Sequence, residues 1–388
     1  MSLLSHMRAW FFGGAKRSDL LFSALVLLGC LLLYFLPTGF EKRVNQNSAH
    51  VSGIVRSVDN SLVRTFGMVK SGSQTVETEV LEGPRQGEVL EATNYLVGKM
   101  ELDRIFQPGD GALVSITEVE GKITDVRVPD YERLSVEKAL LTAFMLLLVV
   151  YGGFTGFQAL LSFVFSALGL WKILFPCLLK GYDPVLVALL LTTVLSVAII
   201  YLVAGVTARG HAALLGTLAG LLLTYGLASL FASPFHINGA VRPFAETLLY
   251  SGFLNLNLRR IFLASVFLAS SGAVMDLSMD IATAMEEVLR HQPQLPRWKL
   301  LRSGLGVGRA VIGTMTTTLL LAYSGSSITM MMTFIAQGVP LPVILNNSYV
   351  SSELFHTVVG SFGLVTVAPL TALIAAFVLK GASESRVK

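Results

Sequence analysis

Eight apolar segments, each near the length of a membrane-spanning helix, constrain this chain more than any other feature of its sequence. They cover residues 19–36, 136–153, 156–178, 184–207, 212–232, 260–281, 304–323 and 355–379. A helix needs about 20 apolar residues to cross roughly 30 Å of hydrocarbon. Only 14% of the 388 residues are charged, against about 25% in a soluble globular protein. We therefore predict an α-helical polytopic membrane protein of about eight transmembrane helices.

The segment 38–135 has the composition of a water-soluble domain set between the first two spans. It holds 15 acidic and 11 basic residues, which is nearly half of the charges in the chain. Its short runs of β-patterned sequence are separated by Gly, Pro and Asp turns, as strands are; the runs are HVSGIVRSV, QTVETEVLEG, ALVSITEVEG and ITDVRVP. About five short strands favour a small all-β, OB-like barrel. Because it lacks a cluster of aromatic residues for stacking, we expect a structural or gating domain.

Basic residues predict how the chain is oriented in the membrane. Arg8, Lys16 and Arg17 precede the first span, which places the N-terminus in the cytoplasm by the positive-inside rule. Eight crossings return the C-terminus to the same side, and the short segments then inside carry 11 Lys and Arg against 5 outside. No small-residue cleavage site precedes Pro37, so we expect an uncleaved first span.

These boundaries divide the chain into four parts. They are a cytoplasmic N-terminus with the first span (1–37), an extracytoplasmic β domain (38–135), a seven-helix membrane domain (136–380) and a cytoplasmic tail (381–388). The only cysteines, Cys30 and Cys177, lie in apolar segments, so no disulfide holds the β domain. Two stretches, 242–258 and 325–353, are neither plain helix nor plain loop. The first is amphipathic and fits the outer interface, and the second predicts a short, broken or re-entrant helix.

The sequence lacks the motifs of several common functions. There is no HExxH or CxxC spacing, no Walker loop, no nucleophile elbow and no paired-carboxylate hydrolase pattern. No run of Lys and Arg is interleaved with aromatic residues, as nucleic-acid binding would favour. We expect no enzymatic activity, no cofactor, no metal site and no nucleic-acid partner.

Two carboxylates in the segment 261–289 are the strongest functional candidates. Asp276 and Asp280 are one helical turn apart, so both lie on one face of a helix. An ionised carboxylate at mid-membrane costs about 2.5 kcal/mol or more, and such residues usually face protein or water. A proton- or cation-coupling site is one interpretation. A buried structural Asp276 with Asp280 among the lipid headgroups is the other.

Arg309 is expected at a depth similar to that of the two aspartates, and we predict that it pairs with one of them. Four hydroxyls follow it as candidates for a polar path, namely Thr314, Thr316, Thr317 and Thr318, although Thr in a membrane helix usually bonds to its own helix backbone. Small residues that would let helices approach closely are Gly272, Gly308 and Gly313.

A second polar group opens the last span. Glu353 and His356 are three residues apart and share a helix face, and Asn346 and Asn347 precede them. His titrates near neutral pH, so we count Glu353 and His356 among the candidates for proton coupling and the two asparagines among those for a polar path. The alternative is that these side chains only mark the interface at the start of a helix.

The chain resembles the YibE/F family of bacterial multi-pass membrane proteins. The resemblance spans most of 140–380 and rests on three stretches, ASSGAVMDLSMDIATAMEEV (269–288), GRAVIGTMTTTLLLAYSGSS (308–327) and SELFHTVVGSFGLVTVAPLTALIAA (352–376). It implies a protein of the bacterial cytoplasmic, or inner, membrane. The family tends to have an acidic residue where this chain has Ala310 and a basic one where it has His356, so a family charge network does not carry over at those positions.

A weaker similarity, from Gly272 and Asp276 and the Thr-rich helix after Arg309, is to the SecF and resistance–nodulation–division transmembrane halves. Those halves use intramembrane Asp with Thr and Arg partners for proton coupling. Our first hypothesis is therefore a solute transporter or exporter, proton-coupled through Asp276. The alternative is a non-transporting scaffold or assembly factor whose β domain binds an envelope partner. We expect the lipid bilayer and an unknown small solute or ion as partners, and a second copy of the chain or an envelope protein as further candidates.

Overall fold

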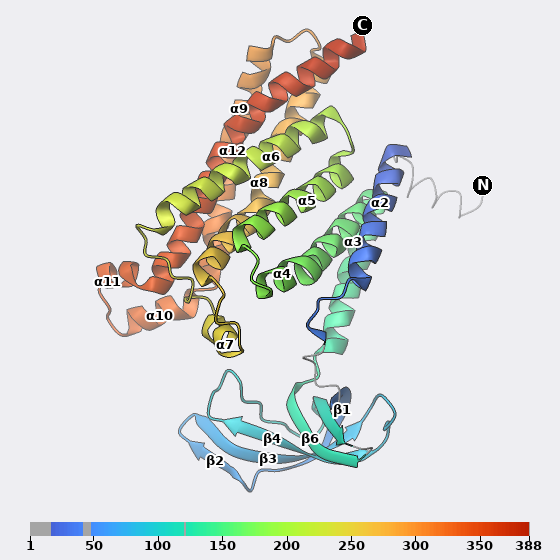
Figure 1. The fold of residues 1–388 in the computed structure, drawn as a ribbon, viewed down its shortest axis with the longest axis vertical. Coiled ribbons are helices and arrows are strands. Elements are labelled where there is room, and N and C mark those ends of the chain that lie inside the picture. The colour runs from blue at the N-terminus through green and yellow to red at the C-terminus, as the bar shows by residue number, and fades with distance from the viewer. Residues whose placement is uncertain (1–16, 42–47, 120–121, 388) are drawn as a thin grey trace, which may run out of the picture. The chain divides into compact units, whose positions relative to one another are not determined.

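The computed structural model describes residues 17–41, 48–119 and 122–387, and it divides into two compact units (Figure 1). One unit runs to Thr38 and resumes at Leu148, and it is helical. The other is Gly39–Leu147 and contains every strand that the structure describes.

The second unit is a five-stranded barrel with one additional strand. Its strands are β1 (Ser48–Asp59), β2 (Val63–Phe66), β3 (Val69–Val80), β4 (Val89–Val97), β5 (Gly111–Val119) and β6 (Lys122–Tyr131). Antiparallel pairs run β4–β3–β1–β5–β6, and a short parallel pair between β4 and β6 closes the circle. The four predicted runs correspond to β1, β3, β5 and β6, and the five-stranded barrel agrees with the predicted small β domain.

Alternating side chains fill the barrel. Val76, Ala112, Val114 and Val128 are fully buried, and together with Val55, Val80, Ala92, Phe106 and Ile116 they form a separate hydrophobic core. Two buried amides add a polar centre, because Asn94 Nδ2 donates to Gln74 Oε1 at 3.1 Å and Gln74 Nε2 donates to the Phe106 carbonyl at 2.9 Å. The barrel thus has its own interior, as expected of a unit with its own fold.

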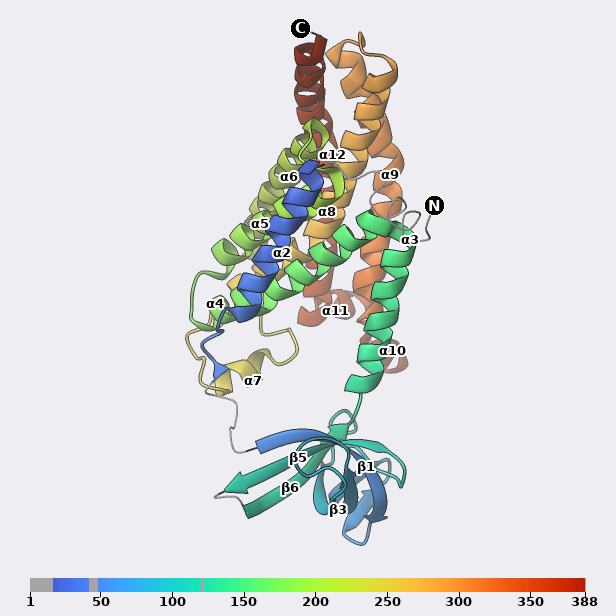
Figure 2. The same ribbon diagram turned by 90° about the vertical axis from the view of Figure 1, so that its right-hand side faces the viewer.

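Within the described residues, seven helical segments are long and apolar enough to cross a membrane, where the sequence predicted eight spans. The predicted segments 136–153 and 156–178 run on as one, Leu134–Leu179, made of α3 (Leu134–Gly169), η2 (Leu170–Leu174) and α4 (Phe175–Leu179). The backbone of α3 breaks at Gly153 (φ 54°, ψ −130°), a conformation that favours glycine. Figure 2 shows two arms leaving this bend. The structure therefore has one segment fewer than predicted, because a bend and not a loop joins these two parts of the chain.

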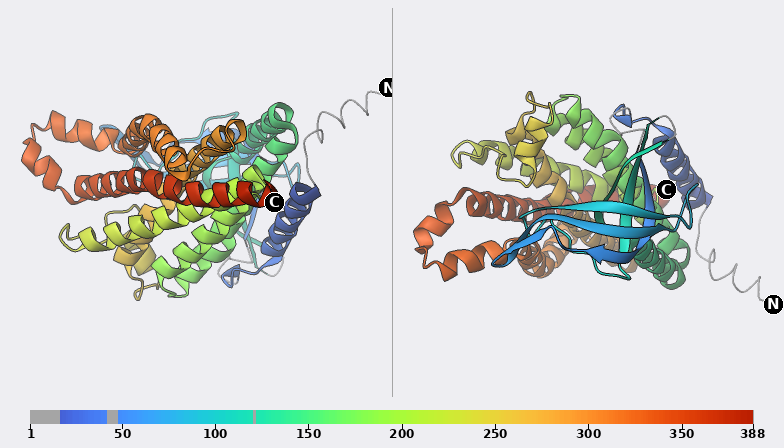
Figure 3. Two further views of the ribbon diagram at one scale, coloured as in Figure 1. Left: turned by 90° about the horizontal axis from the view of Figure 1, so that it is seen from above. Right: turned by 90° about the horizontal axis from the view of Figure 1, so that it is seen from below.

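The other long helices are α2 (Arg17–Phe35), α5 (Pro184–Ala204), α6 (Ala208–Ala232), α8 (Leu258–His291), α9 (Arg297–Gly325) and α12 (Ser348–Val387). Helix α12 packs against α6, α8 and α9, and lies between α6 and α9 in the left panel of Figure 3. Glycines permit this approach: a Cβ on Gly220 would lie 2.7 Å from Val367 Cγ2, and one on Gly308 would lie 2.9 Å from Ala368 Cβ. Small residues at helix contacts are typical of membrane bundles.

The two unclassified stretches contain short helices. The stretch 242–258 forms α7 (Ala245–Tyr250) before α8 begins at Leu258, and 325–353 forms α10 (Ile328–Ala336) and α11 (Leu341–Asn346) before α12 begins. Gly338 (φ 66°) and Pro340 separate α10 from α11, which agrees with the predicted broken helix.

Candidate functional site

Asp276 and Asp280 lie on an exposed stripe that runs from Ala269 to Arg290 on α8. The stripe consists of Ala269, Gly272, Asp276, Asp280, Thr283, Glu287 and Arg290. The opposite face is buried, with Val274, Leu277, Ile281 and Met285 packed in the main core. Neither aspartate forms a hydrogen bond or an ion pair within the described part of the chain. Two adjacent carboxylates are thus presented outward from a helix that is apolar enough to span a membrane.

Arg309 lies at the same level along the bundle but does not form the predicted pair. Asp280 is 11 residues before the end of α8, and Arg309 is 12 residues after the start of α9, so each lies about 17–18 Å from the turn that joins the helices. Arg309 is exposed and makes no ion pair among the residues described. The pair is absent because α9 packs inward through Gly304 and Gly308, on a different face of the helix from Arg309.

The four threonines also lie on α9, and their hydroxyls are already satisfied. Thr314 donates to the Val311 carbonyl, and Thr316, Thr317 and Thr318 each donate to a carbonyl four residues earlier. Three of the four are exposed, and Thr316 is half-buried. Of the three predicted packing glycines, Gly308 contacts Ala368, whereas Gly272 and Gly313 have nothing within 4 Å of a Cβ position.

A second, more tightly built cluster lies where α12 begins. Arg242, in the loop before α7, donates from Nη1 to Glu353 Oε2 at 3.1 Å and from Nη2 to His356 Nδ1 at 2.9 Å. Its guanidinium also lies over the ring of Phe262, 5.2 Å from the centroid. One loop is thereby attached to both α8 and α12.

His356 is the centre of this cluster and is only 5% exposed. Its ring stacks on Tyr323 of α9, with centroids 4.3 Å apart and planes inclined by 24°. The Tyr323 hydroxyl is buried without a hydrogen-bond partner in the described structure, whereas the His356 ring also faces the backbone of Val266. An unpaired buried hydroxyl is costly and calls for an explanation.

Two cavities flank the loop that carries Arg242. One, of about 470 Å³, is lined by Arg242, Glu246, Ser326, Ser327, Ser352 and Glu353 among others. The second, of about 460 Å³, includes Asn346 in its wall, and Val241 and Ser352 border both. The loop has two residues with left-handed backbone, His236 (φ 51°) and Phe244 (φ 62°). Such conformations are unfavourable for side chains larger than glycine and persist where surrounding contacts hold them.

The remaining predicted residue, Asn347, follows the last residue of α11, and its side chain accepts from the backbone N–H of Tyr349 at 3.0 Å. Asn346 donates to the Pro342 carbonyl. No group of three or more metal-binding side chains lies together among the described residues.

The sequence profile of the YibE/F-like protein family matches residues 140–381, which covers most of α3, most of α12 and every helix between them. The chain belongs to the YibE/F family. No curated protein and no solved structure shows a significant match to it. The match includes both the exposed aspartates of this YibE/F-like protein and the cluster around His356.

Sequence reasoning identified Glu353 and His356 but not their partners. Arg242 is more than 100 residues from His356 in the sequence, and Tyr323 is about 30 residues from it. Neither residue forms a sequence motif with Glu353 or His356. An isolated Arg in an amphipathic stretch next to Glu246 was the only available signal.

Proposed function

We propose that this YibE/F-like protein is a transporter of the bacterial cytoplasmic membrane, and that Asp276 takes up and releases a proton during transport. The observation that carries the proposal is the exposed stripe of α8, where Asp276 and Asp280 lie one turn apart with no partner in the described chain. Acyl chains cannot solvate these groups, so water or another protein must cover this face. A water-lined face gives Asp276 the access to protons that coupling requires.

Position along the helix supports this assignment. Asp276 is 15 residues from the end of α8 and 18 from its beginning, so it lies near the middle of the candidate span. Asp280 lies one turn nearer the end, on the same exposed face. The two carboxylates together give a solute or a proton a polar surface within the span.

The test is the accessibility of position 276 to water. In a variant without Cys30 and Cys177, Asp276→Cys should react with a membrane-impermeant, charged thiol reagent in membrane vesicles. Leu222→Cys, exposed near the middle of α6, is the matched lipid-facing control and should react much more slowly. Equal, slow reaction at both positions would show that no water reaches Asp276.

Flux tests the coupling itself. In proteoliposomes with an internal pH dye, Asp276→Asn should abolish the proton movement that accompanies transport while membrane insertion stays normal. An Asp276→Asn variant with full proton movement would refute coupling through this residue. If the protein is a scaffold instead, a partner should bind the β domain, and neither the wild type nor Asp276→Asn should show proton movement.

A further inference from the structure

We propose that the cavity between the start of α10 and Arg242 binds a small zwitterion of the amino-acid type. The cavity has a volume of about 470 Å³, within the size range of small-molecule sites. Val241, Phe244 and Met330 supply apolar wall, and the other lining residues are mostly hydroxyl-bearing or charged. This binding is separate from the proposed proton chemistry at Asp276 and can be measured without flux.

The start of α10 supplies a site for the carboxylate of the ligand. Ser326, Ser327 and Met330 line the cavity, so the first turn of this nine-residue helix borders it. The first N–H groups of a helix have no acceptor within the helix and favour an anion. The side chain of Ser327 makes no capping bond there, which leaves those donors available.

Ser352 is the independent evidence for a ligand. It is 4% exposed and borders this cavity and its neighbour, and its hydroxyl makes no hydrogen bond in the described part of the structure. The hydroxyl is not sealed inside the protein, so what remains exposed of it faces cavity space. A ligand carboxylate in the cavity would accept a hydrogen bond from this hydroxyl.

The charges around the cavity select a zwitterion over a simple anion. Arg242 is bonded to Glu353 and His356 and keeps further N–H donors. Glu246, exposed on the first turn of α7, forms no ion pair among the described residues. One cation and two carboxylates give the lining a formal charge of −1, so a lone carboxylate would be repelled. An ammonium group facing Glu246 removes that repulsion.

Three probes that share the same isobutyl group test the assignment on the full chain in detergent. Leucine carries both charges, 4-methylpentanoate lacks the ammonium, and 3-methylbutylamine lacks the carboxylate. We expect calorimetry to detect leucine binding and to show at least about tenfold weaker binding of the other two. No binding of leucine, or equal binding of either analogue, would overturn the proposal.

Variants assign the two ends of the ligand. Ser352→Ala should weaken leucine binding about three- to tenfold, whereas Ser351→Ala, whose side chain borders only the second cavity, should leave it unchanged. Glu246→Gln should reduce the preference for leucine over 4-methylpentanoate about two- to fivefold. Equal effects of Ser351→Ala and Ser352→Ala, or an unchanged preference in Glu246→Gln, would contradict this arrangement.

Discussion

The Nη2 atom of Arg242 lies 2.9 Å from Nδ1 of His356, at the centre of a buried cluster. A guanidinium group can only donate hydrogen bonds, so Nδ1 must accept and carry no proton. His356 in this arrangement is therefore neutral, with its proton on Nε2. The contact fastens the loop before α7 to the beginning of α12 only while His356 stays neutral.

Acidification should release this contact. Arg242 from the loop, Glu353 from α12 and Tyr323 from α9 are the charged or titratable groups that face His356. Protonation of Nδ1 puts a second cation beside Arg242 and removes the acceptor, so the hydrogen bond is lost when His356 gains a proton. We expect protease cleavage within 234–244 to become faster at acidic pH in the wild type. In His356→Asn, which cannot gain a proton, the rate should change little with pH beyond the protease's own dependence.

Removing one partner of the ion pair should destabilise the bundle. Glu353 is only 17% exposed and bonds to Arg242 at 3.1 Å, so Arg242→Ala leaves a largely buried carboxylate unpaired. We expect a loss of about 1–3 kcal/mol in the free energy of unfolding. The measurement is denaturant unfolding in detergent. The double variant Arg242→Ala/Glu353→Gln should recover part of the loss, and additive effects of the two changes would contradict direct coupling.

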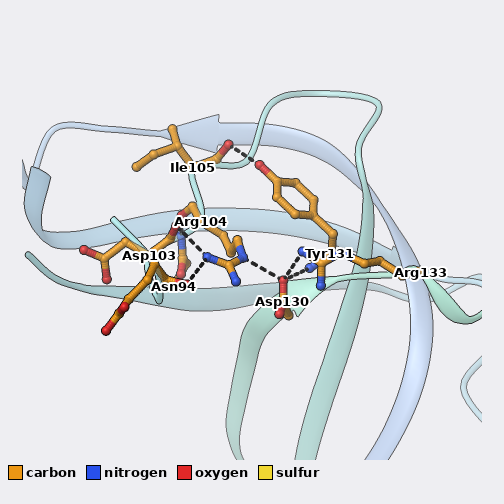
Figure 4. A network of polar contacts seen from close by, with 8 residues as sticks. Asn94, Asp103, Arg104, Ile105, Asp130, Tyr131 and Arg133 are labelled. Carbon is orange, nitrogen blue, oxygen red and sulfur yellow. Dashed lines mark hydrogen bonds and ion pairs between the residues drawn. The ribbon is translucent and has the colours of Figure 1, made fainter. Parts of the chain in front are cut away.

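Asp130 should make the barrel sensitive to acid. It bonds to Arg133 and Arg104, each at 2.9 Å (Figure 4). The pKa of Asp130 is lowered from 3.8 to about 2, chiefly by the hydrogen bond from Arg133. Partial burial opposes this shift, and the Tyr131 N–H and Arg104 add to it. Because the pKa is lowered by folding, the stabilisation is present above about pH 4 and is lost as pH falls toward 2.

Asp130→Asn should remove that stabilisation at neutral pH. About one-third of the Asp130 side chain is exposed, so we expect a loss of only about 1 kcal/mol. Hydrogen exchange of barrel peptides in the full chain should be faster in the variant at pH 7, and the difference from wild type should vanish near pH 2. Asp125→Asn, from the more exposed pair with Arg127, is the control and should change exchange less.

The fourth prediction concerns the close packing of α9 against α12. A Cβ at Gly308 would lie 2.9 Å from Ala368 Cβ, whereas one at Gly313 meets nothing within 4 Å. We expect Gly308→Ala to lower the midpoint of thermal unfolding, with a cost of about 1–3 kcal/mol. Gly313→Ala should be neutral or slightly stabilising because Ala favours the helix. If Gly313→Ala is as harmful as Gly308→Ala, another helix packs on that face.

Much of the architecture could be predicted from local sequence patterns. Apolar length predicted the helices, because a spanning segment must satisfy its own backbone hydrogen bonds and shows this in composition alone. Strand alternation predicted four of the six strands. The strand β4, VLEATNYLV, was missed although Ala92, Asn94 and Leu96 alternate inward, because buried Ala and Asn weaken the hydrophobic signal.

The sequence by itself determined that this is a multi-pass helical chain with one β domain, and that two carboxylates share a face of α8. Only the tertiary structure decided which way that face points and which residues gather around His356. Helical periodicity fixes relations within one element, whereas Arg242, Tyr323 and His356 meet because three separate segments pack together. The failed pairing of Arg309 has the same cause: equal depth follows from residue spacing, but the rotation of α9 is set by Gly304 and Gly308 against their neighbours.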